Sequence, residues 1–399
     1  NMERKTKIIA TVGPSLASES KINNIIDAGA NVLRINFSHG TLDDHRNVIE
    51  WARNSKKQVA IMQDIQGPKI RTGISTKNTV LEKSKKVALT SIETESNQDI
   101  VFINYENLFA DVNIGDRVFI DDGQIVLKVV EKEDDKLIAL ILIGGELRNN
   151  QGVAFPDSKL SVTAITEQDK EHLEFGSKYD VDFVAVSFVR NAADVNLVKE
   201  LIPSDVKVIA KIELKTALDN IEEILDVSDG VMVARGDLGV QLPIEQVPFV
   251  QKKILDAANK KGKFSITATE MLQSMKTAYR PTRAEVTDIT NAILEGTDAV
   301  MLSAETSIGE NPNRVVEVMS IICRETDSRN DISSLLSKED SDKDSMTTTL
   351  ARAAVQVAND IQAKSIIAFT ETGKTPLLIS NFRPKAEIIT FSTKEKTLN

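Results

Sequence analysis

The chain repeats one unit, in which a short apolar run is followed by a polar cluster and then by an amphipathic helical pattern. The apolar runs are continuous and largely β-branched, which is typical of strands buried on both faces of a parallel sheet. They lie at residues 8–12, 32–35, 59–62, 181–186, 206–210, 231–234, 264–268 and 299–302. This alternation predicts an α/β fold of parallel βα units, and eight units favour a closed (β/α)8 barrel, although the count alone also allows an open sheet.

Helical patterns follow most of the predicted strands. They occur at residues 20–27, 218–225, 247–258, 283–294 and 315–323. Pro281-Thr282 ahead of Glu285 has the order of a helix start signal, in which a hydroxyl residue precedes an acidic residue by three positions.

The helical period disappears between about residues 74 and 156. Short apolar runs there are broken by turn-forming pairs such as Asp122-Gly123 and Gly144-Gly145, which predict hairpins in a small β-barrel domain. This domain follows the third strand, so it is inserted in a loop at the C-terminal face, where barrel active sites lie. We interpret it as a lid over the active site, with an inert insertion as the alternative.

The pattern changes again towards the end of the chain. Residues 327–344 are rich in Ser, Asp and Lys and predict a solvated linker. A helical pattern at 347–361 and strand-like runs at 363–370 and 387–391 then predict a C-terminal α/β domain that is short for a complete one. We therefore expect a catalytic barrel at 1–67 and 162–338, an inserted β lid at 68–161 and a partial regulatory domain at 339–399.

Composition limits the classes of partner. The formal net charge of −10 argues against broad binding to nucleic acid or to an anionic membrane. No apolar run reaches the ~18–20 residues that span a bilayer. The single cysteine, Cys323, fits a reducing compartment, so we expect a cytoplasmic protein. Three histidines are too few for a His-rich zinc site, so a metal site here should use oxygen ligands.

Polar side chains gather where the predicted strands end, as expected for the mouth of a barrel. In strand order they are Arg34, Asn36 and Ser38, then Asp64, Ser187, Lys211 and Glu213, Arg235 and Asp237, Thr267 and Thr269, and finally Ser303 and Glu305. Several are i, i+2 pairs, whose side chains point the same way while the chain stays extended. Each pair can therefore face one cavity.

Two carboxylates at neighbouring strand ends, Glu213 and Asp237, could form an incomplete oxygen cage for Mg²⁺. They could equally be ion-pair partners of barrel lysines and arginines, and their spacing does not decide. Lys211 could supply a point charge to a transferring phosphoryl group or to an enolate, or could simply pair with Glu213. Arg34 could clamp a phosphate or serve as an ion-pair partner.

Two further features are weak on their own. The segment 235–239 reads RGDLG, a Gly-flanked turn that could present free N–H groups to an anion ahead of a helix begun by Pro243. His39 could contact a nucleotide or cap a loop.

Seven motifs together resemble those of the pyruvate kinase family, in the same order and rough spacing over essentially the whole chain. They are NVLRINFSHG at 31–40, DIQGPKIRTG at 64–73, VIAKIEL at 208–214, VMVARGDLG at 231–239, TATEMLQSM at 267–275, RPTRAE at 280–285 and AVMLSAET at 299–306. The resemblance implies a (β/α)8 TIM barrel with an inserted lid. It also implies a glycolytic phosphotransferase that moves the phosphoryl group of phosphoenolpyruvate to ADP and gives pyruvate and ATP.

The resemblance also assigns roles. Glu213 and Asp237 match the Mg²⁺ ligands, with Mn²⁺ as a substitute, and Lys211 matches the lysine that stabilises the phosphoryl group. Arg34 matches the arginine at the phosphate. Gly236, Asp237 and Thr269 match the residues at the substrate carboxylate, and Thr269 and Ser303 match those near the route of enolate protonation. The nucleotide side is matched by Arg71, His39 and Asn36, and a monovalent-cation site by Asn36, Ser38, Asp64 and the carbonyl of Ile65. The family is usually a homotetramer.

One departure concerns potassium. Many family members have Glu where this chain has Lys69, and in the family Glu accompanies dependence on K⁺ whereas Lys accompanies independence. A fixed ammonium would supply the positive charge that K⁺ otherwise brings. We therefore expect an enzyme of the potassium-independent bacterial type, although the retained Asn36, Ser38 and Asp64 would still allow K⁺ to bind.

A second departure concerns regulation. The loop residues Thr370, Thr372, Gly373, Lys374 and Thr375 match the segment that holds an effector phosphate in allosteric members. Glu371 beside them disfavours a doubly phosphorylated sugar. A monophosphate such as AMP or a sugar monophosphate is the expected effector, and a loop without a ligand is the alternative.

Two rival functions remain from the sequence. A carbon–carbon lyase on the same barrel would also use Mg²⁺ held by Glu and Asp to stabilise a pyruvate enolate, but it has no nucleotide to place. A catalytically silent binding protein could keep the fold, but it would have no need of Lys211, Glu213, Asp237 and Thr269. Nucleotide binding and turnover would separate the three.

Overall fold

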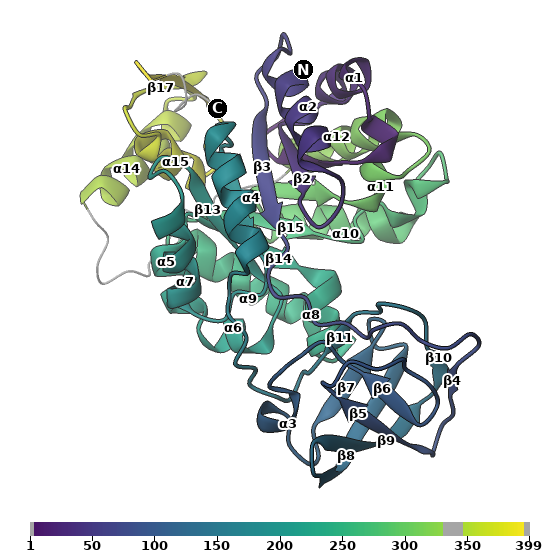
Figure 1. Cartoon of the computed structure of the whole chain (residues 1–399). Coiled ribbons are helices and arrows are strands. Elements are labelled where there is room, and N and C mark those ends of the chain that lie inside the picture. The colour runs from purple at the N-terminus through teal and green to yellow at the C-terminus, as the bar shows by residue number, and fades with distance from the viewer. Residues whose placement is uncertain (1–3, 330–345, 395–399) are drawn as a thin grey trace.

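The computed structural model describes residues 4–329 and 346–394. The eight predicted runs form a closed parallel barrel in the order β1-β16-β15-β14-β13-β12-β3-β2 (Figure 1). The barrel strands are β1 Lys7–Val12, β2 Val32–Asn36, β3 Ala60–Ile65, β12 Phe183–Val186, β13 Lys207–Ile212, β14 Gly230–Ala234, β15 Phe264–Ala268 and β16 Ala299–Leu302. The closed barrel is therefore confirmed, and the open sheet is excluded.

Helices surround the barrel at the predicted helical segments, but the segment 218–225 is divided between two helices at Asn220. They are α1 Glu19–Ala28, α2 Leu42–Arg53, α4 Glu167–Lys178, α5 Ala192–Leu201, α6 Lys215–Asp219, α7 Ile221–Val227, α8 Arg235–Gln241, α9 Val247–Lys260, α10 Arg283–Leu294, α11 Ala304–Ser307 and α12 Pro312–Arg329, with short 3-10 turns η1 Pro14–Leu16, η2 Ile244–Gln246 and η3 Gln273–Lys276. Helix α12 continues to Arg329, so the first residues of the predicted linker 327–344 are helical instead. The rest of that linker lies outside the described residues.

The barrel strands are apolar along their length because both of their faces are buried. Outward-facing residues such as Ile8, Val184 and Val208 pack against the surrounding helices. Inward-facing residues such as Ile9 and Met232 fill the barrel interior. The backbone of Gly230 lies so close to its neighbour that a Cβ atom there would stand 2.6 Å from the carbonyl oxygen of Phe264. The continuous apolar runs of the sequence thus reflect burial on two sides.

The insertion after β3 folds around a hydrophobic core of its own. Its elements are β4 Val80–Leu81, β5 Lys86–Thr90, β6 Ile100–Phe102, α3 Leu108–Asp111, β7 Arg117–Ile120, β8 Ile125–Glu133, β9 Lys136–Ile143, β10 Gly145–Glu146 and β11 Val153–Ala154. The expected hairpins form at β7–β8 and β8–β9. Strand pairing gives a six-stranded sheet, β11-β7-β8-β9-β5-β6, and the pair β10-β4. Strands β11 and β6 are the edges of this sheet, and isolated bridges link both edges to one segment, because Arg71 pairs with Gly152 beside β11 and Thr72 pairs with Ile103 beside β6. These bridges join the two edges, in keeping with the expected small barrel.

The C-terminal part is an α/β unit, as predicted. It comprises α14 Met346–Asp360, β17 Ser365–Phe369, α15 Lys374–Asn381 and β18 Glu387–Phe391. The two strands pair in parallel, from Ser365 opposite Glu387 to Phe369 opposite Phe391. The unit lies at the end of the barrel opposite the insertion (Figure 1).

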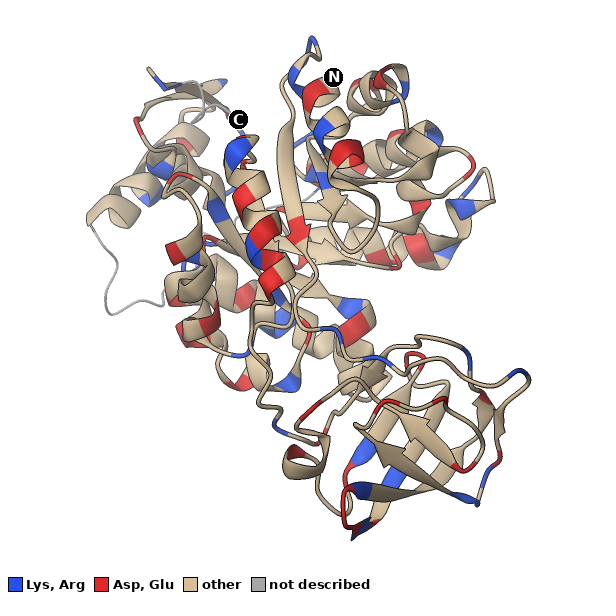
Figure 2. Ribbon diagram, viewed as in Figure 1, with Lys and Arg blue, Asp and Glu red and all other residues tan. Residues whose placement is uncertain are grey.

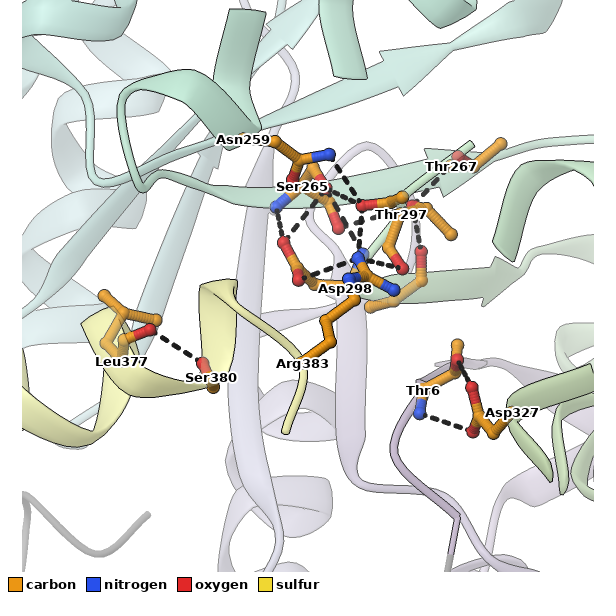
Figure 3. A network of polar contacts seen from close by, with 12 residues as sticks. Thr6, Asn259, Ser265, Thr267, Thr297, Asp298, Asp327, Leu377, Ser380 and Arg383 are labelled. Carbon is orange, nitrogen blue, oxygen red and sulfur yellow. Dashed lines mark hydrogen bonds and ion pairs between the residues drawn. The ribbon is translucent and has the colours of Figure 1, made fainter. Parts of the chain in front are cut away.

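Arg383 joins this C-terminal unit to the barrel. It follows α15 with a positive φ of 45° and donates to the carbonyl oxygens of Gly296 and Thr297 and to the carboxylate of Asp298 (Figure 3). Asp298 also accepts from the backbone N–H of Ser265 at 2.9 Å and from its hydroxyl at 3.0 Å. These residues precede β16 and begin β15, so the C-terminal unit docks on the amino-terminal end of the barrel.

Charged residues of both signs are interspersed along the described chain in Figure 2. Among the described helices, none is both long and apolar enough to cross a membrane.

Candidate active site

The site is centred on Lys211, in β13 at the carboxyl end of the barrel. Its ammonium contacts Asp64 Oδ1 at 3.2 Å, Glu213 Oε1 at 2.9 Å and Ser187 Oγ at 2.8 Å. Lys211 is only 9% exposed. Burial alone would lower its pKa, but the carboxylates of Asp64 and Glu213 raise it, so the ammonium stays charged. The structure therefore brings together the ends of three adjacent strands, β3, β12 and β13.

Arg34 completes the cationic side of this cluster from β2. Its Nε donates to Asp64 Oδ2 at 2.7 Å and its Nη1 to Thr11 Oγ1 at 3.0 Å. Burial alone would raise the pKa of Asp64, but Arg34 and Lys211 lower it, so this carboxylate is ionised. Arg34 and Lys211 thus share Asp64, and Lys211 also pairs with Glu213, so two buried cations face two buried carboxylates.

Glu213, directly after β13, is almost completely buried, with 1% exposure. Its Oε2 accepts from the backbone N–H of Phe188 at 2.7 Å. Its pKa is raised to about 7, chiefly by burial; Lys211 opposes the rise and the nearby Asp237 adds to it. Two carboxylates that repel one another suit a divalent cation, which would relieve both the repulsion and the desolvation of Glu213.

No three His, Cys, Asp or Glu side chains of the described residues form a group that could hold a metal by themselves. Glu213 and Asp237 are only two, so a metal between them would need further ligands from substrate or water. This fits an ion such as Mg²⁺, which keeps waters and binds through one or two carboxylates. The alternative role of Glu213, that of an ion-pair partner, is also observed, because Glu213 pairs with Lys211.

The sixth strand end differs from the prediction. Residues 235–239 are not a turn ahead of a helix but the beginning of helix α8. The backbone N–H of Gly236 donates to Thr269 Oγ1 at 2.9 Å, so the expected pair of Gly236 and Thr269 does meet. Arg235 donates to Asp288 on α10 at 2.8 Å and to the carbonyl of Thr269 at 2.5 Å. Arg235 and Asp237 therefore do not point the same way, because residues two apart do so only in an extended chain and the chain here is already helical.

The side chains at the seventh and eighth strand ends do not all face the site. Thr267 is fully buried and donates to Thr297 Oγ1 at 3.0 Å (Figure 3). It alternates with Ile266 and Ala268, which fill the barrel interior, so Thr267 faces the surrounding helices and not the site. Thr269 has a positive φ of 70°, a conformation rare for a β-branched residue. The buried Glu305 accepts from the backbone N–H groups of Ser303 at 2.7 Å and Leu272 at 3.2 Å. Glu305 thereby ties the loops that carry Ser303 and Thr269.

The candidate monovalent-cation ligands lie on adjacent strands. Asn36 pairs with Asp64 in the register of β2 and β3. Asn36 Oδ1 accepts from the backbone N–H of Ser38 at 3.1 Å, and the carbonyl of Ile65 accepts from Ser187 Oγ at 2.8 Å. His39 is exposed on the same loop. Of these groups, Asp64 contacts Lys211 directly and the carbonyl of Ile65 is linked to it through Ser187.

The insertion brings its own charges to the barrel mouth. Burial and Arg71 lower the pKa of Lys69, as does Lys211, whereas Asp237 raises it. Burial raises the pKa of Asp122, Asp237 raises it further, and Lys69 opposes the shift. Asp122 lies in the turn between β7 and β8, with a positive φ of 53°. These mutual influences mean that the β7–β8 turn faces Lys69 and Asp237.

The predicted effector loop is far from this cluster, in the C-terminal unit. Thr370 Oγ1 accepts from the backbone N–H of Gly373 at 3.0 Å, and Gly373 has a positive φ of 77° where helix α15 begins. Thr372, Lys374 and Thr375 lie on the same turn and the first residues of the helix.

Sequence reasoning missed four contributors to the site, namely Thr11, Phe188, Asp122 and the role of Ser187. Ser187 was noted at the end of its strand without a function. The polarity of a strand end next to Lys211 could have drawn attention to it. Phe188 and Asp122 contribute through backbone conformation and lid position, which no local pattern indicates.

The chain is similar to known proteins over nearly all its length. A family model described as "Pyruvate kinase, barrel domain" matches residues 3–316, and one described as "Pyruvate kinase, alpha/beta domain" matches residues 348–399. A pyruvate kinase of Staphylococcus epidermidis is 42% identical over 99% of this chain and 69% of its own length. A pyruvate kinase of Geobacillus stearothermophilus is 40% identical over 99% of this chain and 69% of its own length.

A solved structure is similar to this chain in its three-dimensional fold as well. The crystal structure of a pyruvate kinase from Cryptosporidium parvum superposes with a TM-score of 0.96 at 36% sequence identity. The match covers 99% of this chain and 84% of that one.

Proposed function

The chain belongs to the pyruvate kinase family, and from the geometry of its site we infer how it moves the phosphoryl group of phosphoenolpyruvate to ADP. Family membership sets aside the lyase and the silent binding protein. The observation that carries our inference is the buried Lys211, held by Asp64, Glu213 and Ser187 at the barrel mouth. Phosphoryl transfer depends on charge neutralisation and in-line positioning, and this cluster supplies fixed charges without a nucleophile.

We assign Lys211 to the phosphoryl group in flight and Arg34 to the phosphate of the bound substrate. Both side chains are buried and already paired with Asp64, so their positions are set before substrate binds. Such preorganised charges stabilise a transition state more effectively than mobile ones.

We assign Glu213 and Asp237 to a divalent metal, which the family generally requires. We propose Mg²⁺, with Mn²⁺ as a substitute, because both candidate ligands are carboxylates. When bound, this ion would neutralise the phosphoryl and enolate oxygens and supply Lewis-acid polarisation. The protein's part is to hold Glu213 rigidly through Lys211 and the N–H of Phe188.

The substrate carboxylate is assigned to the beginning of α8. The N–H of Gly236 points to Thr269 Oγ1 and lies beside the exposed Asp237. Arg235 pairs with Asp288 and donates to the carbonyl of Thr269, which fixes the turn that carries both groups. Thr269 and Ser303, tied together through Glu305, are our candidates for the route by which the enolate is protonated.

The nucleotide is assigned to the space between the barrel and the insertion. Arg71 opens the insertion, and His39 is exposed on the neighbouring loop after β2. Because the turn carrying Asp122 faces Lys69 and Asp237, we propose that the insertion is a lid. A closed lid would exclude water, which otherwise competes with ADP for the phosphoryl group.

Lys69 is our candidate for the charge that K⁺ would otherwise supply. Its electrostatic neighbours are Arg71, Lys211 and Asp237, so it stands beside the reacting charges. K⁺ can still bind at Asn36, Ser38, Asp64 and the carbonyl of Ile65, but we propose that activity does not need it. The homotetramer, the cytoplasmic location, the domain limits and a monophosphate effector at residues 370–375 stay predictions.

A coupled assay of pyruvate release tests this assignment. Phosphoenolpyruvate, ADP and Mg²⁺ are supplied once with K⁺ and once with tetramethylammonium at the same ionic strength. Equal rates in the two salts are expected for the natural chain. In the Lys69→Glu variant we expect the rate in tetramethylammonium to fall at least about tenfold and K⁺ to restore it. A natural chain that is active only with K⁺ would refute the role of Lys69 and leave the reaction itself intact.

A further inference from the structure

We propose that Ser187 is a positioning residue for the phosphoryl transfer, and that the turn Ser187-Phe188 at the end of β12 fixes Lys211 and Glu213 relative to one another. This inference rests on the role of Lys211 proposed above. The turn contacts both residues from the neighbouring strand, one through a hydroxyl and the other through a backbone N–H.

The hydroxyl of Ser187 has a defined direction. Two acceptors lie near it, the carbonyl oxygen of Ile65 at 2.8 Å and Asp64 Oδ1 at 3.5 Å, and the shorter contact takes its single proton. The oxygen can therefore only accept from Lys211, whose Nζ lies 2.8 Å away. Ser187 is 4% exposed, so bulk water does not take its place beside the ammonium. A hydroxyl held in this way gives Lys211 a fixed acceptor of its own.

A fixed neutral acceptor matters because the other two partners of Lys211 are charged and shared. An ammonium has three N–H donors, and Asp64, Glu213 and Ser187 take them. Asp64 also pairs with Arg34, and Glu213 is the candidate metal ligand. Coulomb attraction to two carboxylates holds the charge nearby but gives it little direction. The hydroxyl supplies the direction.

The conformation of Phe188 supports the same function. Its φ of 55° is in the left-handed region, where a bulky side chain is rare. This conformation directs its N–H to Glu213 Oε2 at 2.7 Å. Gly67, after β3, lies against the turn: a Cβ atom there would stand 3.3 Å from both the Phe188 ring and the carbonyl of Ser187. The unusual backbone is therefore held by its surroundings, as expected where it serves a site.

The consequence for catalysis is specific. If Ser187 aims an ammonium that stabilises the transition state, its loss should lower kcat and leave the KM for phosphoenolpyruvate nearly unchanged. A purely structural serine would instead lower thermal stability without this split.

The test compares Ser187→Ala and Ser187→Thr with the natural chain in the coupled assay. Ser187→Ala should lower kcat about 10- to 100-fold, as expected for a misplaced catalytic group, with KM changed less than about threefold. Ser187→Thr retains the hydroxyl and should recover to within about threefold of the natural rate. Ser228→Ala is the matched control, because Ser228 is buried with a hydroxyl that has no hydrogen-bond partner among the described residues. Thermal unfolding should show all three variants folded.

The outcomes are distinguishable. A folded Ser187→Ala enzyme with natural kcat would overturn the proposal, and so would equal losses in the alanine and threonine variants. A loss that K⁺ reverses would place the effect at the carbonyl of Ile65 rather than at Lys211, and would also overturn it. Lys211→Met serves as the reference: if it keeps its activity, the proposed role of Lys211 fails together with this inference. If only Ser187→Ala is unaffected, the role of Lys211 stands.

Discussion

Lys211 shows how burial and charge combine at the scale of a single residue. Its side chain is buried, yet its pKa is raised because Asp64 and Glu213 outweigh the cost of desolvation. Deprotonation therefore does not switch this residue in the neutral range. Its function follows from a permanent charge at a fixed place.

Replacing Lys211 by Met should remove that charge while keeping much of the volume. We expect kcat to fall at least about 10²- to 10³-fold, the usual effect of losing one preorganised electrostatic group. Lys263→Met is the control, because Lys263 donates to the carbonyl of Ser228 at 2.8 Å, away from the cluster. Steady-state kinetics with phosphoenolpyruvate and ADP check the expectation. Similar rates for the two variants would contradict it.

His45 gives the protein a dependence of stability on pH. Its ring lies 4.3 Å from that of Phe37, and burial, followed by His172, lowers its pKa to about 4. Because this value is below the ordinary 6.5, the unfolded chain binds the proton first as pH falls. The stability contribution is complete above pH 6.5 and is lost progressively towards pH 4.

We expect the free energy of unfolding to fall by up to about 1.4 kcal/mol per pH unit on account of His45 within this window. His45→Phe removes the titrating group and should make the curve shallower between pH 6.5 and 4. Urea unfolding followed by circular dichroism at several pH values measures the slope. Parallel curves for the two proteins would show that His45 is not responsible.

At the scale of elements, helix α10 supports the site from outside the barrel. Thr282 Oγ1 accepts from the N–H of Glu285 at 3.2 Å, and Glu285 accepts in return from the N–H of Thr282 at 2.7 Å. Glu285 also accepts from Ser274 in η3 at 2.6 Å, and Asp288 forms an ion pair with Arg235. The capping box predicted from Pro281-Thr282 and Glu285 is thus confirmed, and it connects three elements.

Removing the cap should cost stability rather than activity. For Thr282→Ala we expect a loss of about 1 kcal/mol, the typical value for an N-cap hydroxyl. Thr282→Ser keeps the acceptor and should be nearly neutral. Thermal or urea unfolding of the two variants gives the comparison, and kcat serves as the check that the barrel mouth is intact. Equal stability of the alanine and serine variants would mean that the hydroxyl contributes nothing.

At the scale of the whole molecule, Arg383 connects the C-terminal unit with the amino end of the barrel (Figure 3). Burial raises the pKa of Asp298, and Arg383 opposes the rise. Asp298 and Ser265 belong to the starts of β16 and β15, whose other ends lead to Ser303 and Thr269. The C-terminal unit is therefore anchored on strands that reach the site.

Arg383→Met should loosen this anchor and leave Asp298 with a still higher pKa. We expect a lower unfolding temperature and faster cleavage by chymotrypsin at Phe369, which is 77% exposed. Arg46→Met is the control, since Arg46 forms exposed ion pairs with Asp43 and Glu50 that contribute little. Mass spectrometry of the digest identifies the cleavage site. Identical digestion of the two variants would exclude an anchoring role.

The sequence by itself determined the parallel βα units, the insertion after the third strand and the C-terminal α/β unit, and it favoured a closed barrel over an open sheet. It did so because strands buried on both faces must be continuously apolar, and because hairpins need turn residues at their tips. Lys211 and Glu213 were placed together correctly, since β13 keeps its extended period up to Ile212. Motif resemblance supplied the family, which the comparisons confirmed.

Only the tertiary structure decided how those side chains are used. Arg235 pairs with Asp288 on α10 because α8 begins at this residue. Thr267 faces the surrounding helices because it alternates with the inward-facing Ile266 and Ala268. Ser187 and Phe188 gain their importance from β13, which lies next to β12 in space but follows it by a whole helix in sequence. Local patterns fix periodicity and polarity, whereas contacts between distant segments depend on how the barrel closes.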